Sequence, residues 1–128
     1  MRRRTGLLVV VLSALVAGCS SQAGSRPARG DAKVITTAEM DASGHTDAFA
    51  LVQALRPQWL RIRGRASIAK PETIWVYLDG AQLGGPNHLR NMATHAISSL
   101  QYFDGLEASQ RWGLDHGAGA IVVSTRGR

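Results

Sequence analysis

The feature that most constrains this chain is its N-terminal segment, which is built unlike the rest of the sequence. Residues 2–4 are arginines, an apolar run follows over residues 7–16, and Cys19 comes after two small residues. The apolar run is shorter than the about 20 residues that a membrane-spanning helix needs. A positive start, a short apolar run and small residues are typical of a secretory signal, so residues 1–18 are predicted to direct export.

The residues around the cysteine indicate the kind of signal. Val16-Ala17-Gly18-Cys19 resembles the lipobox of bacterial lipoproteins. The resemblance implies that a diacylglyceryl group is attached to the Cys19 sulfur, that the chain is cut before this residue, and that the new amino terminus receives a further acyl chain such as palmitate. Two or three acyl chains hold a protein stably on a membrane, because each buried methylene contributes about 0.8 kcal/mol. The alternative is that Cys19 is an ordinary small residue of a signal peptide or of an uncleaved anchor.

The residue after the lipobox bears on which membrane holds the anchor. In many Gram-negative bacteria an aspartate at this position favours retention in the inner membrane, and here the position is Ser20. The resemblance therefore implies a cell-envelope location at the outer membrane, facing the periplasm. Cys19 is the only cysteine, so the exported domain is expected to have neither a disulfide nor a thiolate metal site.

The chain behind the signal is long enough for one small domain. Residues 19–32 have no apolar periodicity and predict a flexible tether that follows the lipidated cysteine, and residues 33–128 are expected to fold. The formal net charge is +6, and half of it belongs to the three arginines of the signal. The remaining charge, without a dense basic run, does not indicate a nucleic-acid partner.

Residues 33–128 alternate between short strand-like and short helix-like patterns. A helical apolar stripe ends before Pro57, with Thr46 as its candidate cap, and the Asp79-Gly80 pair predicts a tight hairpin turn. Strands are expected at residues 34–37, 59–68, 74–78, 81–83, 97–103 and 120–125, and helices between 46 and 57, from 86, and at 106–112. Because hairpin and crossover connections are mixed, the predicted fold class is α+β, a small mixed β-sheet with two or three short helices.

Residues 61–125 resemble the plug domain of TonB-dependent outer-membrane receptors. The resemblance is carried, in the family's order, by Arg63-Gly64, Val76-Tyr77-Leu78-Asp79-Gly80, residues 97–105 and residues 119–125. Ala108 and Trp112-Gly113 also stand where plug domains place an alanine and an aromatic-glycine pair. No barrel strands and no TonB-box segment are recognisable, so the resemblance implies the fold more than it implies uptake or gating.

The side chains that could carry chemistry form no recognised catalytic or metal-binding pattern. His45, His88, His95 and His116 lack the helical spacing of metal ligands and are expected on the surface or in loops. Asp115-His116 leaves a small hydrolase open as an alternative, although no Gly-x-Ser-x-Gly motif supplies a nucleophile. No catalytic, cofactor or metal residue is predicted, and lipid attachment at Cys19 is the functional site expected.

Two groups of side chains leave a choice between a structural and a binding role. Arg61, Arg63 and Arg65 share one face of an expected strand, where they either protect that strand or contact an anionic partner. Trp75 and Tyr77 either pack in the core, which is the default for aromatic residues, or form an adhesive patch on a one-sided sheet.

These observations favour a non-enzymatic envelope lipoprotein whose plug-like domain binds a protein partner, such as an outer-membrane β-barrel receptor, on the periplasmic side of the outer membrane. One alternative is a periplasmic module that binds a small ligand. The other, with less support, is the small hydrolase. No cofactor is expected in any of these roles.

Overall fold

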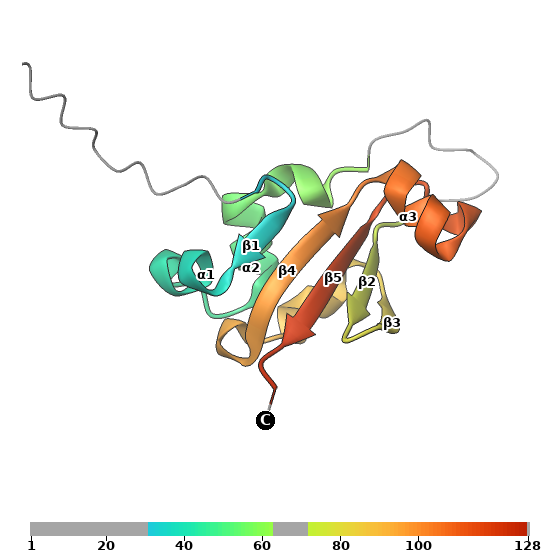
Figure 1. The fold of residues 1–128 in the computed structure, drawn as a ribbon. Helices are drawn as coiled ribbons and strands as arrows, with labels where there is room; N and C mark the ends of the chain where they lie inside the picture. The colour runs from blue at the N-terminus through green and yellow to red at the C-terminus, as the bar shows by residue number, and fades with distance from the viewer. Residues whose placement is uncertain (1–30, 63–71, 128) are drawn as a thin grey trace, which may run out of the picture.

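The computed structural model describes residues 31–62 and 72–127, which form one sheet with helices on both of its faces (Figure 1). The strands are β1 (Val34–Thr36), β2 (Trp75–Leu78), β3 (Ala81–Gly84), β4 (Ile97–Phe103) and β5 (Ala120–Thr125). They lie in the order β1-β4-β5-β2-β3, with β2 and β5 parallel and the other neighbours antiparallel. The predicted α+β class with a small mixed sheet is confirmed.

Short helices fill the connections between the described strands. The helical segments are α1 (Thr37–Ser43), α2 (Ala48–Leu55), α3 (Gly105–Trp112) and the 3-10 turns η1 (Pro57–Leu60), η2 (Pro86–Asn91), η3 (Thr94–Ala96) and η4 (Leu114–His116). α2, η1 and η2 pack on one face of the sheet, whereas α3 packs on the other face at one end (Figure 1). The second face is therefore only partly covered.

Side-chain caps decide where the α-helices begin. Thr36 and Glu39 form a capping box at the start of α1, a helix that the apolar pattern did not predict. Asp47 caps α2 by accepting a hydrogen bond from the Ala50 backbone N–H at 2.8 Å, so the prediction that Thr46 is the cap was wrong. The carboxylate of Asp47 accepts this bond and also faces the positive end of the helix.

The predicted hairpin between β2 and β3 is confirmed. Asp79 and Gly80 both adopt positive φ angles, 47° and 90°, as a two-residue turn of this hand requires. Thr125 at the end of β5 supports the turn, because its backbone N–H and its hydroxyl donate to the two Asp79 carboxylate oxygens at 2.9 and 2.6 Å.

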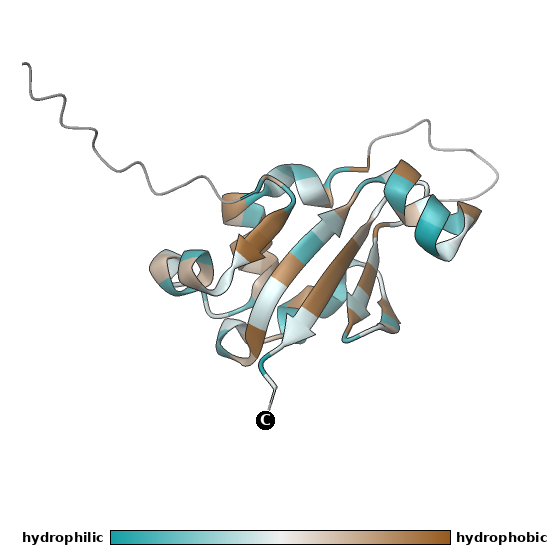
Figure 2. Cartoon of the chain, viewed as in Figure 1, coloured by the Kyte–Doolittle hydropathy of each residue, from teal (hydrophilic) through white to brown (hydrophobic). Residues whose placement is uncertain are grey.

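The main core lies between the sheet and the face covered by α2, η1 and η2. Alternate residues of the central strands point into it. In Figure 2, β4 changes between brown and pale or teal along its length, whereas β5 is brown over most of its length. Its fully buried large side chains are Trp59, Ile35, Met40, Leu51, Ile74, Leu89, Ile97, Leu100, Ile121, Val52, Val76 and Val123.

The structure contradicts the strand expected over residues 59–68 in the part that it describes, residues 59–62. Trp59 lies in η1, where its ring stacks on Tyr102 at 5.6 Å and its indole N–H donates to the Ala32 carbonyl at 3.1 Å. Pro57 begins this turn at a position that proline favours, and burial of the indole outweighs the alternating pattern. Arg61 is exposed and belongs to no strand. Arg63 and Arg65 lie outside the described residues, as does Cys19.

Candidate functional site

One face of the sheet remains largely open beyond the area that α3 covers. The register places Gln101 of β4 between Val34 of β1 and Val122 of β5, and places Ser99 between Thr36 and Ser124. Their strand neighbours Ile35, Leu100 and Val123 are buried in the core, so these residues point to the other side of the sheet. We call this surface the open sheet face; it consists of Val34, Thr36, Ser99, Gln101, Val122 and Ser124.

The open sheet face carries no charge. Its six side chains are hydroxyl, amide or valine groups, and each is exposed or half-buried. Charged residues are depleted at the centres of protein interfaces, because removing a charge from water is costly. The surface can therefore be covered by another protein without burying an ion.

The covered end of the same face is built around a buried hydrogen bond. The Tyr77 hydroxyl lies 2.7 Å from His116 Nε2, and each residue is only 5 % exposed. Trp112 of α3 stacks on the Tyr77 ring with centroids 4.7 Å apart, and Phe103 meets Trp112 edge to face at 5.3 Å. The prediction that the aromatic residues pack is confirmed, and Tyr77 does not form an exposed adhesive patch.

The contacts of His116 indicate which ring nitrogen carries the hydrogen in the neutral imidazole. Nδ1 lies 3.3 Å from the Gly113 carbonyl oxygen, which can only accept, so this nitrogen carries the hydrogen. In the neutral imidazole Nε2 then accepts from the Tyr77 hydroxyl, and burial raises the pKa of that phenol. The four histidines were expected on the surface or in loops. His116 does lie in the connection between α3 and β5, in η4, but its side chain is buried between β2 and α3.

The Asp115-His116 pair does not take the form of a catalytic dyad. His116 Nε2 contacts the Tyr77 hydroxyl, and Nδ1 contacts the Gly113 carbonyl. The backbone carbonyl of Asp115 accepts a hydrogen bond from the Trp75 indole N–H at 2.9 Å. His88 and His95 are exposed and His45 is half-buried. Across residues 31–62 and 72–127, no three histidine, cysteine or acidic side chains gather as metal ligands would.

An apolar hollow lies at the opposite end of the sheet from α3. Its volume is about 330 Å³, and it is open to solvent on one side. The residues that line it are Leu78, Asn91, Met92, Ala93, Ala96, Ile97 and Thr125. Its small size and largely apolar lining fit one small apolar group.

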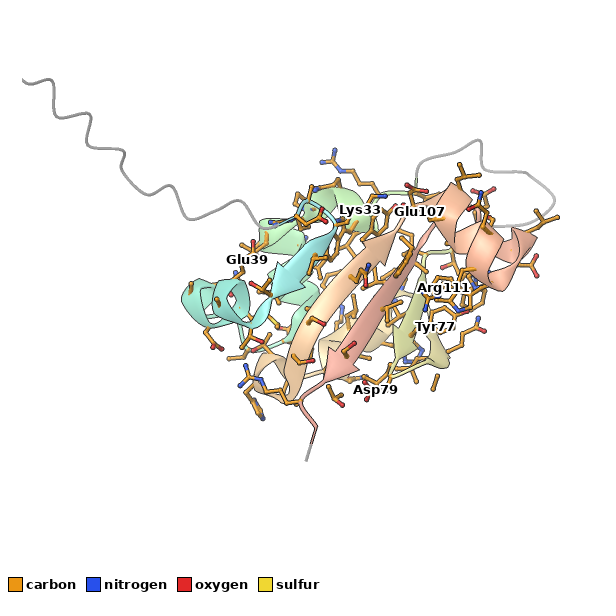
Figure 3. The ribbon with its side chains drawn as sticks, viewed as in Figure 1. Lys33, Glu39, Tyr77, Asp79, Glu107 and Arg111 are labelled. Carbon is orange, nitrogen blue, oxygen red and sulfur yellow. The ribbon has the colours of Figure 1, made fainter. Side chains whose placement is uncertain are left out.

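An ion-pair cluster fastens the start of the domain to α3. The Lys33 ammonium donates to the carboxylates of Asp104 and Glu107 at 3.1 and 2.6 Å (Figure 3). The bond to Glu107 is the main cause that raises the pKa of Lys33, and the Glu107 backbone N–H is the main cause that lowers the pKa of Asp104. Asp104 is also the N-cap of α3, so one carboxylate both starts this helix and holds the incoming chain.

Sequence reasoning did not find the Tyr77–His116 pair. The two residues are 39 positions apart, and no local pattern connects them. Two sequence patterns could have suggested it. Trp112 and His116 are four residues apart, and the alternation of β2 places Tyr77 on the opposite face of the sheet from Val76.

Comparison with known proteins gives no relative. No family model, no curated protein and no solved structure matches this chain. Within the part of the chain that the structure describes, none of the helices combines the length and the hydrophobicity that crossing a bilayer would require.

Proposed function

We propose that this chain is a lipid-anchored envelope protein whose plug-like domain binds a protein partner through the open sheet face, without enzymatic activity. The observation that carries the proposal is the absence of charged side chains among the six residues of that face. Lipidation of Cys19 would hold the domain at the periplasmic side of the outer membrane. The resemblance to plug domains makes an outer-membrane β-barrel receptor the first partner to test.

The chemistry of the open sheet face suits a protein surface better than a small molecule. Adjacent strands lie about 4.8 Å apart, so its side chains form a flat array rather than a concave pocket. The serine and threonine hydroxyls and the Gln101 amide can exchange hydrogen bonds with a partner, and Val34 and Val122 add apolar contact.

The test is a cross-linked pull-down of the intact protein from membranes in mild detergent, with the captured proteins identified by mass spectrometry. Gln101→Lys places a charge in the centre of the open sheet face and should abolish capture of the partner. Gln53→Lys makes the same change at an exposed position of α2, on the other side of the sheet, and should leave capture intact.

Cys19→Ala provides the control for the anchor, because this protein should no longer stay with the membrane. Equal capture by the Gln101→Lys and Gln53→Lys proteins would show that the partner binds elsewhere. Full membrane retention of the Cys19→Ala protein would remove the basis for lipid anchoring.

A second candidate function is binding of a small apolar ligand in the hollow near Leu78 and Ile97. Saturable binding of a small apolar dye would support it, provided that Ala96→Trp, which fills the hollow, removes the binding. Gln101→Lys should have no effect on this assay, so the two candidate functions are separable.

A further inference from the structure

We infer that the domain stands on the membrane with its α3–η4 end, residues 31–33 and 104–116, toward the lipid, and that Leu106 and Leu114 contact the lipid surface. The inference rests on the proposed lipid anchor at Cys19 and adds an orientation to it.

The first observation is the exposure of two leucines at this end. Leu106 in the first turn of α3 is 71 % exposed and Leu114 in η4 is 92 % exposed. Both exceed the other exposed large hydrophobic residues of the described chain, Ile62 at 50 % and Leu83 at 37 %. A single exposed leucine is ordinary, but these two belong to neighbouring segments, since Gly105 at the start of α3 lies against the Gly117 carbonyl just after η4.

The second observation is the place where the chain enters the domain. Lys33 is bound to Asp104 and Glu107, which flank Leu106, and Figure 3 shows Lys33 and Glu107 side by side. The Ala32 carbonyl is held by Trp59, so the entering chain is fixed at two consecutive residues. The described chain therefore begins beside η1, at the same end of the sheet as the start of α3, and Lys33 reaches from there to the carboxylates on either side of Leu106.

The distance to the anchor favours this orientation. Eleven residues, 20–30, lie between Cys19 and Asp31, and the twelve residue steps from one to the other span at most about 40 Å when fully extended. A domain of this length is roughly 30 Å across. The opposite end could touch the lipid only if nearly the whole reach of the segment ran along the side of the domain, whereas the α3–η4 end meets the lipid without any such requirement.

The charges at this end fit a lipid surface on which hydrophobic contact dominates. Lys33 balances part of the negative charge of Asp104 and Glu107. Arg111 is exposed, and its guanidinium lies over the rings of Trp112 and Phe103, at 5.0 and 5.2 Å, between the two leucines in the sequence. An arginine that rests on aromatic rings can reach lipid phosphates while its stem stays apolar. Four carboxylates and two cations lie within residues 31–33 and 104–116, so the contact is expected to rest on the two leucines and not on attraction to anionic lipid.

The proposed orientation leaves the open sheet face accessible. This face runs along β4 and β5 away from α3, so it rises from the membrane and remains free for a protein partner (Figure 1). Lipid contact and partner binding then use different surfaces of the same domain.

The experiment places a fluorescent label on single cysteines of the full-length, lipidated protein in phosphatidylcholine vesicles. The sulfur of acylated Cys19 is a thioether, so an introduced cysteine is the only free thiol. Leu106→Cys and Leu114→Cys report on the α3–η4 end. His95→Cys is the matched control, because His95 is exposed in η3 and the length of β4 separates it from α3.

The expected result is that nitroxides attached to lipid quench the label at positions 106 and 114, while iodide in the water quenches it several-fold less there than at position 95. Equal quenching at all three positions in protein that floats with the vesicles would overturn the orientation and leave the anchor intact. Protein that does not float with vesicles would refute the anchor and the orientation together. Protection of position 114 that appears only in native membranes would assign the leucines to a protein contact and overturn the inference.

Discussion

Replacing Tyr77 by phenylalanine tests the buried hydrogen bond between the Tyr77 hydroxyl and His116, which lies on the face of the sheet that α3 covers. The change keeps the ring that stacks on Trp112 and removes the hydroxyl that donates to His116 Nε2. An intact hydrogen bond contributes about 0.5–1.5 kcal/mol net, whereas leaving a buried acceptor without a partner costs about 1–3 kcal/mol. Since His116 is only 5 % exposed and Trp75 and Trp112 lie beside its ring, water cannot replace the lost donor, and the larger cost applies.

We therefore expect Tyr77→Phe to lower the free energy of unfolding by about 1–3 kcal/mol. This is a substantial part of the roughly 5–15 kcal/mol available to a domain of this size, and each kcal/mol should lower Tm by about 4–8 °C. The assay is urea and thermal unfolding of a chain that begins at Ser20, followed by tryptophan fluorescence and circular dichroism.

A double-mutant cycle with His116→Ala separates the hydrogen bond from general loss of packing. In the His116→Ala background no buried imidazole nitrogen loses its partner, so Tyr77→Phe should then lower the free energy of unfolding only slightly. A Tyr77→Phe protein as stable as the parent, or an equal cost in both backgrounds, would refute the hydrogen bond between the Tyr77 hydroxyl and His116 Nε2.

Three further predictions concern stability. Gly105→Ala should strongly destabilise the chain, because a Cβ there would collide with the Gly117 carbonyl oxygen, and a soluble, fully cooperative unfolding transition near that of the parent would contradict the contact. Leu100→Ala should cost about 2–5 kcal/mol in urea unfolding, since Leu100 is fully buried in the main core. Asp79→Asn keeps the positive φ of the turn but loses the charge; because hydrogen bonds from Thr125 hold the pKa of Asp79 below its ordinary value of 3.8, the stabilisation exists above that pH and disappears as the pH falls through the lowered pKa. The parent should therefore exceed Asp79→Asn in Tm at pH 7, and the gap should narrow below pH 3.8.

Local patterns predicted most of the elements correctly. The strands at β2, β4 and β5, the hairpin at Asp79-Gly80 and the end of α2 before Pro57 depend on alternation, turn chemistry and proline, which act within a few residues. The start of α1 was missed although Thr36 and Glu39 have the spacing of a capping box, because the β-branched residues before them favoured a longer strand.

The surfaces proposed for binding were less predictable, because they depend on which strands become neighbours. Gln101 belongs to an open face only because β1 and β5 flank β4 and α3 stops short of it. Lys33 meets Asp104 and Glu107 across more than 70 residues, a contact that no local pattern signals.

The sequence by itself determined the features that short segments encode, namely the α+β class and most of the turns and strand positions. Tertiary structure decided what depends on the packing of distant segments. It turned Trp59 from a strand residue into the buried anchor of η1, and it enclosed His116 beside Tyr77. It left Leu106 and Leu114 in solvent. The physical reason is that caps, turns and periodicity act over a few residues, whereas burial is decided by the elements that the whole chain brings together.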